Sequence, residues 1–191
     1  MSKSKTPRPH LSYSQLKLWE SDPQEYHRRY VLGEKWEGNR YTEFGSKLAN
    51  ALEFDEPTDD LGLEHIRLFL PKFVKREFKI ESNCLGVPIL SKLDGFDPKK
   101  LEIDEVKTGK SWNQKRVDED DQLTFYSLIC YLKYKKQANL IRLHWARTIE
   151  EDGIVKATGE LKTFITNRFF PQQMEMANRI KKAWAEIKKL K

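Results

Sequence analysis

The spacing of apolar residues alternates between helical and strand-like periods along this 191-residue chain, and this alternation constrains its fold more than any other feature. Residues 42–53 and roughly 61–76 have helical apolar spacing. From Phe78 to Lys107 apolar and charged residues largely alternate, which is typical of half-buried strands. Further helical and alternating segments follow. The pattern predicts an α/β or α+β sandwich in which helices flank a central mixed sheet.

The N-terminal part begins with a clear helix-start signal. Ser12 and Gln15 fit a capping box, which predicts a helix over residues 13–20. An Asp-Pro pair then restarts the helical pattern and predicts a second short helix to about residue 30. Residues 36–40 are expected to form a loop.

The alternating region predicts three consecutive strands arranged as a meander. They are expected near Phe78 and Ile80, at Val87–Asp94 and at Leu101–Lys107. The remaining elements are expected to be a helix, two strands and a C-terminal amphipathic helix, at about 119–135, 141–145, 161–165 and 174–187.

Length and composition favour one soluble domain over residues 11–191, preceded by a disordered basic arm at residues 1–10. The net charge of +6 is compatible with a polyanionic partner, although 29 acidic residues weaken that signal. No apolar run is long enough to cross a membrane, and no secretory signal is evident, so a cytoplasmic location is expected.

The chain has two cysteines, Cys84 and Cys130. In the expected cytoplasmic setting, buried free thiols are favoured over a disulfide. Two cysteines cannot supply a four-cysteine iron–sulfur cluster or a four-cysteine zinc site. The sequence therefore predicts no iron–sulfur cluster.

One short segment gathers the residues that could carry chemistry. Asp94 ends one predicted strand, and Glu105 and Lys107 lie two apart on the next, so they project from the same face. The short intervening turn places Asp94 beside them. Two carboxylates can hold Mg²⁺ or Mn²⁺, while the lysine can orient or deprotonate a water and offset charge on a phosphate. This trio predicts phosphodiester hydrolysis.

These residues, with the Thr-Gly that follows Lys107, resemble the PD-(D/E)xK nuclease superfamily and specifically its RecB-like exonuclease branch. Three other segments resemble motifs of that branch in the same order: residues 11–31, 44–53 and 121–126. The resemblance covers roughly residues 11 to 145. It implies a restriction-endonuclease-like core and a metal-dependent DNA nuclease, foremost an exonuclease, acting in recombination, repair or phage DNA metabolism.

The resemblance also implies roles for individual residues. Asp94, Glu105 and the backbone carbonyl of Val106 would hold the metal, with Glu53 as a further candidate ligand. The residues implied to support catalysis or position DNA are Gln122, Tyr126 and Ser14. DNA is the implied partner, and a helicase or annealing protein could accompany it.

The chain departs from the family pattern at three positions. Ala49 stands where the family has a histidine, and Glu53 follows one helical turn later. Asp22 replaces the cysteine that cluster-bearing members use, and Leu93 replaces a proline. The missing histidine keeps open the alternative of a catalytically weak or inactive DNA-binding module on the same fold. A restriction-type endonuclease is a second alternative.

Other charged residues have simpler interpretations. Asp104 should point to the opposite strand face from Glu105, in a structural role, and the acidic run at 118–121 should complement a helix dipole. His144, on a predicted strand, could face the cleft. Glu53 could equally be an ordinary solvated glutamate on a helix surface. The alternative for Gln122 and Tyr126, which share a helix face, is ordinary packing, although the positioning role is favoured.

Overall fold

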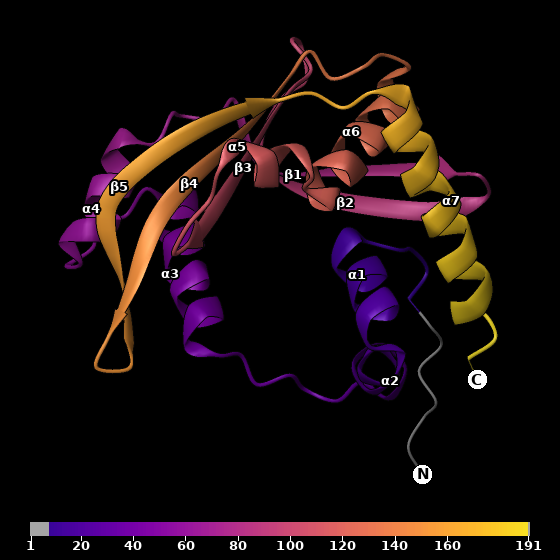
Figure 1. Cartoon of the computed structure of the whole chain (residues 1–191), viewed down its shortest axis with the longest axis horizontal. Coiled ribbons are helices and arrows are strands. Elements are labelled where there is room, and N and C mark those ends of the chain that lie inside the picture. The colour runs from indigo at the N-terminus through magenta and orange to yellow at the C-terminus, as the bar shows by residue number, and fades with distance from the viewer. Residues whose placement is uncertain (1–7, 191) are drawn as a thin grey trace.

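The chain folds around a five-stranded mixed sheet with the order β1-β2-β3-β4-β5 (Figure 1). The structure is a computed structural model and describes residues 8–190. The strands are β1 (Lys75–Cys84), β2 (Val87–Asp97), β3 (Glu102–Gly109), β4 (Leu140–Glu151) and β5 (Ile154–Thr166). The helices are α1 (Tyr13–Ser21), α2 (Pro23–Tyr26), the π-helix η1 (His27–Leu32), α3 (Arg40–Phe54), α4 (Leu61–Phe69), α5 (Gln114–Asp118), α6 (Asp121–Tyr134) and α7 (Phe170–Ile187).

The sheet combines the predicted meander with one parallel pair. Strands β1, β2 and β3 are antiparallel neighbours, as the sequence pattern predicted. β3 and β4 are parallel, and the connection between them runs through α5 and α6. Such a crossover is needed because parallel strands cannot be joined by a tight turn. β5 returns antiparallel to β4 after a turn at residues 152–153.

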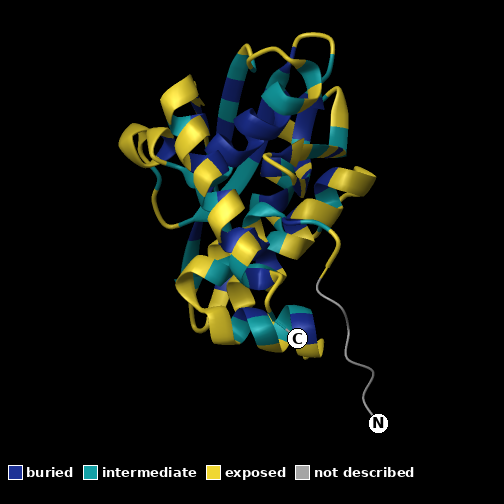
Figure 2. Cartoon of the chain, turned by 90° about the vertical axis from the view of Figure 1, so that its right-hand side faces the viewer, coloured by how far each residue is buried: buried dark blue, intermediate teal, exposed yellow. Residues whose placement is uncertain are grey.

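Two separate apolar cores lie on opposite faces of the sheet. On β4, Leu143 belongs to the core that also contains residues of α1, α6 and α7, whereas Ala146 belongs to the core formed with α3 and α4. Successive strand residues point to opposite faces, so odd-numbered and even-numbered residues of β4 divide between the two cores. Figure 2 shows buried segments concentrated in the sheet and in the helices against it.

The N-terminal helices are fixed to the sheet through backbone and side chains. The amide of Leu11 donates to the Pro88 carbonyl at 2.9 Å, and the Leu11 carbonyl accepts from Leu90 at 3.1 Å. Ser12 and Gln15 form the predicted capping box of α1. Leu16 and Tyr26 are almost completely buried, so this segment is an integral part of the main core.

Several predicted boundaries were wrong for identifiable reasons. α4 ends at Phe69 and not near residue 76, because Pro71 cannot continue a helix. α5 was not predicted, and β4 and β5 are longer than the predicted strands, forming an extended hairpin. α3 begins at Arg40, with Asn39 as its N-cap, so the loop occupies residues 33–39 and not the predicted residues 36–40.

Three further predictions concern the N-terminal arm, the two cysteines and membrane-spanning helices. The predicted basic arm falls mainly on residues 1–7, which lie outside the described residues; Arg8 stacks over the Tyr30 ring at 5.0 Å. Cys84 and Cys130 are buried free thiols, as predicted, and burial raises the pKa of each to about 11. Between residues 8 and 190 no helix is long and apolar enough to span a membrane.

Candidate active site

Strands β2 and β3 separate at the position of the predicted catalytic residues. Their pairing covers only Gly95 to Asp97 of β2, and Gly95 pairs with Asp104. Asp94 therefore lies immediately beyond the last pair. Its Oδ2 accepts a hydrogen bond from the Val106 amide at 2.8 Å, so the Asp94 side chain bridges the gap between the two strands.

Glu105 and Lys107 project from the same face of β3, as their spacing predicted, and α6 supplies two partners. Lys107 Nζ donates to Glu105 Oε1 at 2.5 Å and to Gln122 Oε1 at 2.8 Å. Gln122 Nε2 donates to Glu105 Oε1 at 2.8 Å and contacts the Tyr126 hydroxyl at 2.6 Å. The Tyr126 hydroxyl in turn donates to the Lys92 carbonyl at 3.2 Å. The amide of Gln122 thus holds both Lys107 and Glu105.

The second carboxylate oxygen of Glu105 is buried and lacks a hydrogen-bond partner in the described part of the chain. Glu105 as a whole is 2% exposed. Burial raises the pKa of Glu105 to about 8; Lys107 opposes this shift and Asp94 adds to it. A buried carboxylate oxygen without a partner is expensive to maintain, so it is a natural contact point for a cation.

The two other charged members of the trio respond to the same surroundings. Burial raises the pKa of Asp94, although the Val106 amide and Lys107 oppose the shift. Burial lowers the pKa of Lys107, but Glu105 and Asp94 outweigh it and leave the pKa raised. Lys107 is therefore an ammonium group in this arrangement.

Asp94 and Lys107 line a cavity of about 190 Å³ between β3 and α3. Ala49 and Glu53 line it from α3, and Val106 lines it from β3. Glu53 therefore stands at the cavity as the sequence suggested, and a small side chain occupies the position of the family histidine. The backbone carbonyl of Val106 belongs to the strand segment whose amide holds Asp94.

Three residues of this cavity were not identified from the sequence: Phe73, Arg76 and Glu77. Glu77 forms an ion pair with Lys92 and has a φ of 49°, a left-handed conformation that is unusual for a strand residue. It falls at the interruption of the β1–β2 pairing between Arg76–Gly95 and Phe78–Leu93, directly across from Asp94. Nothing in the local alternation of β1 indicated this bend.

Gly95 allows Phe73 to reach the cavity. A Cβ on this residue would lie 2.5 Å from the Phe73 ring and 2.9 Å from the Asp104 Cβ. The Asp-Gly pair at 94–95 is therefore a close-packing requirement within β2 and not a turn.

A second hollow opens on the other side of Lys107, and we call it the basic hollow. Tyr13 and Lys17 line it from α1, and Trp112, Lys115 and Arg116 line it around α5. Its edge towards α6 is acidic and consists of Glu119, Asp120 and Asp121. Lys107, Thr108 and Gln122 connect it to the rest of the site. The Arg116 guanidinium lies 3.9 Å from the Trp112 ring centroid. Ser14 lines a further hollow that is shared with Lys92, Gln122 and Tyr126.

Asp104 and His144 lie on the opposite face of β3 and do not line these cavities. Asp104 accepts from Arg142 Nε at 2.6 Å, and His144 Nε2 lies 3.0 Å from its Oδ1. The other ring nitrogen of His144 lies 2.9 Å from the Thr163 hydroxyl. His144 is fully buried, so the suggestion that it faces the cleft was wrong.

The oxygen donors at Asp94 and Glu105 fit a hard divalent cation. Residues 8–190 contain no group of three or more His, Cys, Asp or Glu side chains arranged to hold a metal ion. Mg²⁺ commonly uses only one or two carboxylates and completes its shell with water and substrate phosphate. The donor set is therefore sufficient for Mg²⁺ or Mn²⁺ and unsuited to a soft metal that prefers sulfur.

Two of the solved structures that share this fold are named as exonucleases. The chain superposes on the crystal structure of a protein named as an exonuclease from Eubacterium rectale, with a TM-score of 0.60, 13% identity, and coverage of 94% of this chain and 80% of that one. For a phage-related exonuclease from Haemophilus somnus the TM-score is 0.55, at 13% identity, covering 98% and 95%. No known family profile matches the sequence, and no curated protein matches it.

The fold class predicted from the sequence is therefore confirmed. It is an α+β fold in which helices flank a five-stranded mixed sheet, shared with these exonuclease structures over nearly the whole chain.

Proposed function

We propose that this protein is a divalent-metal-dependent nuclease that hydrolyses phosphodiester bonds in DNA. The observation that carries the proposal is the unpartnered, buried Oε2 of Glu105, in a network that also contains Lys107, with Asp94 close by. A structural carboxylate would be expected to have both oxygens satisfied. An oxygen held free inside a charged site indicates that a ligand completes it.

Asp94, Glu105 and the Val106 carbonyl would hold the ion. Asp94, Val106 and Glu53 line the cavity beside the buried Glu105, so Glu53 is a further candidate ligand. When bound, Mg²⁺ or Mn²⁺ supplies Lewis-acid polarisation of the phosphate. Ala49 leaves the family's histidine ligand absent, so water would occupy that position.

Lys107 would act through its charge and its orientation. Gln122 and Glu105 hold its ammonium group at the boundary between the cavity and the basic hollow. From there it can donate a hydrogen bond to the attacking water or to a phosphate oxygen as negative charge develops. Gln122 and Tyr126 would be positioning residues, because they contact Lys107, Glu105 and the backbone of β2.

More specifically, we propose that the protein is a RecB-like exonuclease that acts on DNA ends in recombination, repair or phage DNA metabolism. The sequence motifs and the names of the two structural neighbours support this choice over a restriction-type endonuclease. A helicase or annealing protein would be a compatible partner.

The test is cleavage of labelled single- and double-stranded DNA with Mg²⁺ or Mn²⁺. The wild type should degrade DNA, and EDTA should stop it. Lys107→Ala should lower the rate by about 100- to 1000-fold, as the loss of one preorganised donor does. Asp94→Asn should abolish metal-supported cleavage.

Two exposed residues outside the site provide matched controls. Lys79→Ala, on β1, and Asp59→Asn, before α4, remove the same charges and should leave cleavage unchanged. DNA binding without cleavage in either metal, insensitive to EDTA, would instead establish the alternative of a non-catalytic binding module.

A further inference from the structure

We propose that Arg76 binds a phosphate of the DNA strand in the cavity beside Asp94. The inference rests on the proposed nuclease function, because it takes DNA as the ligand, and it adds a substrate-binding residue on β1 to that site. No residue of β1 was among the site residues predicted from the sequence.

The direction of Arg76 departs from the alternation of its strand. Ile80 is buried in the main core, and Phe78 packs against the same core. Side chains two apart on a strand share a face, so Arg76 would be expected on that face as well. It lies instead over the Phe73 ring, 5.2 Å from the ring centroid, and lines the cavity. Because Phe73 packs against the second core, Arg76 is on the opposite face of the sheet from Phe78.

Glu77 accounts for this change of face. Its φ of 49° is in the left-handed region, and the β1–β2 pairing continues on both sides of it. A left-handed residue interrupts the alternation of a strand, so the side chain before Glu77 is turned towards α3. This conformation is unfavourable for a residue other than glycine, and such residues cluster at functional sites.

The aromatic ring beneath Arg76 is held on two sides. The Phe73 ring centroid lies 5.5 Å from that of His144, and a Cβ on Gly95 would lie 2.5 Å from the Phe73 ring. The ring therefore packs directly against the backbone of β2, one residue after Asp94. Stacking on a fixed ring restricts the Arg76 side chain and leaves its guanidinium donors available to another partner.

The Arg76 guanidinium has no acceptor of its own. Within residues 8–190 it forms no hydrogen bond and no ion pair, although the side chain is half-buried. Burial lowers its pKa and Asp55 opposes that shift, but the Asp55 carboxylate is already bonded to Arg67 at 2.6 Å. An arginine stays charged under such a shift, because its ordinary pKa is about 12 or higher. The cavity thus contains a cation with unused hydrogen-bonding capacity.

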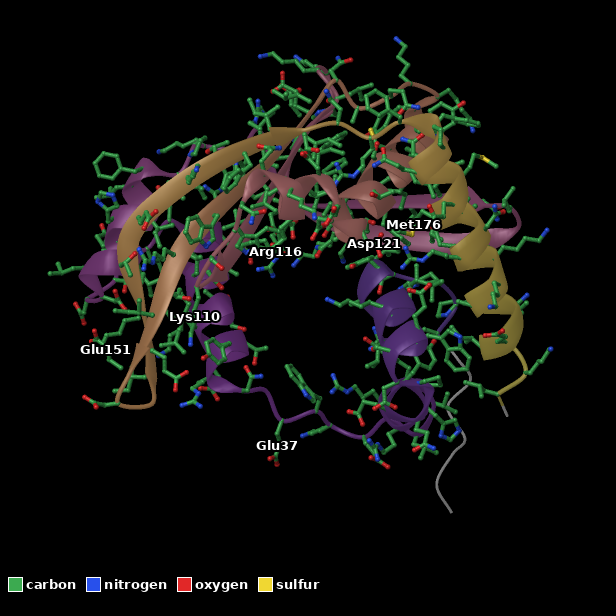
Figure 3. All side chains as sticks on the ribbon, viewed as in Figure 1. Glu37, Lys110, Arg116, Asp121, Glu151 and Met176 are labelled. Carbon is green, nitrogen blue, oxygen red and sulfur yellow. The ribbon has the colours of Figure 1, made fainter. Side chains whose placement is uncertain are left out.

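The two cations that line the cavity in the described part of the chain, Arg76 and Lys107, are held differently. Glu105 accepts a hydrogen bond from Lys107, whereas no protein group accepts one from Arg76. Figure 3 shows Lys110 and Arg116 on the segment that follows β3, and neither lines the cavity. Lys107 is therefore positioned by the protein, and Arg76 is available to a ligand.

A phosphate is the anion that suits this position. Three carboxylate side chains line the same cavity, those of Glu53, Glu77 and Asp94. Their charge would repel a phosphate, so a site that receives one needs a cation to offset the repulsion. A guanidinium does this and can also donate two parallel N–H groups to two phosphate oxygens.

The first test measures binding of a short single-stranded oligonucleotide in EDTA at several salt concentrations. Arg76→Met removes the charge and keeps an apolar stem over Phe73. Affinity at low salt should fall about 10- to 100-fold, as the loss of one charge-assisted contact implies. The slope of log affinity against log salt should fall by about 0.7, the value for one phosphate of a single strand. Lys75→Met removes an exposed cation one residue earlier, and this matched control should change neither quantity.

Arg76→Lys provides a second variant that keeps the charge. It should keep the salt dependence of the wild type and lose part of the affinity, because an ammonium group cannot make the two parallel contacts. Circular dichroism and thermal unfolding show whether each variant is folded. A folded Arg76→Met protein with wild-type affinity and salt slope would overturn the proposal.

A direct contact is distinguished from a structural role by neutralising the phosphate as well. Oligonucleotides just long enough for full affinity receive one neutral methylphosphonate linkage, at each position in turn. One position should lower the affinity of the wild type and have little further effect in Arg76→Met, because the two partners of one contact are coupled. If every linkage has the same effect in both proteins, Arg76 contacts no phosphate and the proposal is wrong.

The role of the bend is tested with two substitutions of Glu77. Glu77→Gly and Glu77→Val both remove the carboxylate, but only valine disfavours the left-handed conformation. At equal folded fractions, Glu77→Gly should bind the oligonucleotide more tightly than Glu77→Val, and only in Glu77→Gly should affinity depend on Arg76. Equal affinities would contradict the role of the bend in directing Arg76.

The outcomes separate this inference from the proposed function. If the wild type cuts DNA and the Arg76→Met protein binds it unchanged, the phosphate site is wrong and the nuclease assignment stands. If the wild type cuts no DNA in any metal but Arg76→Met loses affinity and salt dependence as described, the phosphate site stands and the nuclease assignment fails. Absence of DNA binding by the folded wild type would overturn the phosphate site.

Discussion

Asp104 and Glu105 are neighbours on β3 and both are almost completely buried, but the hydrogen-bond partners of the two carboxylates differ. Asp104 faces Arg142 and His144, which satisfy it with hydrogen bonds at 2.6 and 3.0 Å. Glu105 faces Lys107 and Gln122, and one of its oxygens has no partner.

The pKa values of the two carboxyl groups are therefore shifted in opposite directions. Burial alone would raise the pKa of Asp104, but His144 and Arg142 outweigh it and lower the pKa. Burial raises the pKa of Glu105 to about 8, and Lys107 opposes it only in part. A satisfied buried carboxylate stabilises strand pairing, whereas an unsatisfied one marks the place where a ligand is expected.

The largest expected effect is on catalysis. Glu105→Gln should lower metal-dependent DNA cleavage by about 1000-fold or more, because it weakens a metal contact whose contribution is several kcal/mol. Steady-state cleavage with Mg²⁺ measures it. If Asp104→Asn lowered the cleavage rate as much as Glu105→Gln at the same folded fraction, the two carboxylates would not differ in function, and the account would be contradicted.

The next effect is on stability. Asp104→Asn should lower the free energy of unfolding by about 3 kcal/mol, because it leaves Arg142 and His144 without their buried anion. Glu105→Gln should have a smaller effect, because burial already disfavours the charged carboxylate that the neutral amide replaces. Urea unfolding of both variants in EDTA measures the difference, and a larger loss for Glu105→Gln would contradict it.

The smallest effect is on the pH dependence of stability without metal. With a folded-state pKa of about 8, the native protein binds a proton at Glu105 that the unfolded chain has released, so stability should fall between about pH 4.5 and 8. The lowered pKa of Asp104 works in the opposite direction: its contribution is present above its ordinary pKa of 3.8 and is lost in stronger acid. Thermal unfolding of wild type and Glu105→Gln in EDTA compares them; identical profiles from pH 5 to 8 would be incompatible with a protonated Glu105.

Residues that meet through local geometry could be predicted from the sequence. Glu105 and Lys107 share a strand face because side chains alternate, and Asp94 follows from a short turn. The meander of β1 to β3 could be predicted for the same reason. Gln122 lies on α6, and the family resemblance identified its motif.

Residues that meet through the order of the strands could not be predicted. Asp104 and His144 are neighbours only because β3 and β4 are parallel, a pairing that local alternation does not specify. Phe73 and Glu77 reach the cavity because β1 bends across from Asp94. These contacts depend on tertiary packing, which overrides local pattern.

Binding of Mn²⁺ measured by electron paramagnetic resonance tests most directly whether the open oxygen of Glu105 completes a cation site. The wild type should bind Mn²⁺ saturably in the absence of DNA, and Mg²⁺ should compete. Affinity should fall sharply in Glu105→Gln and stay unchanged in an Asp59→Asn control. Undiminished Mn²⁺ affinity in a folded Glu105→Gln protein would contradict the account.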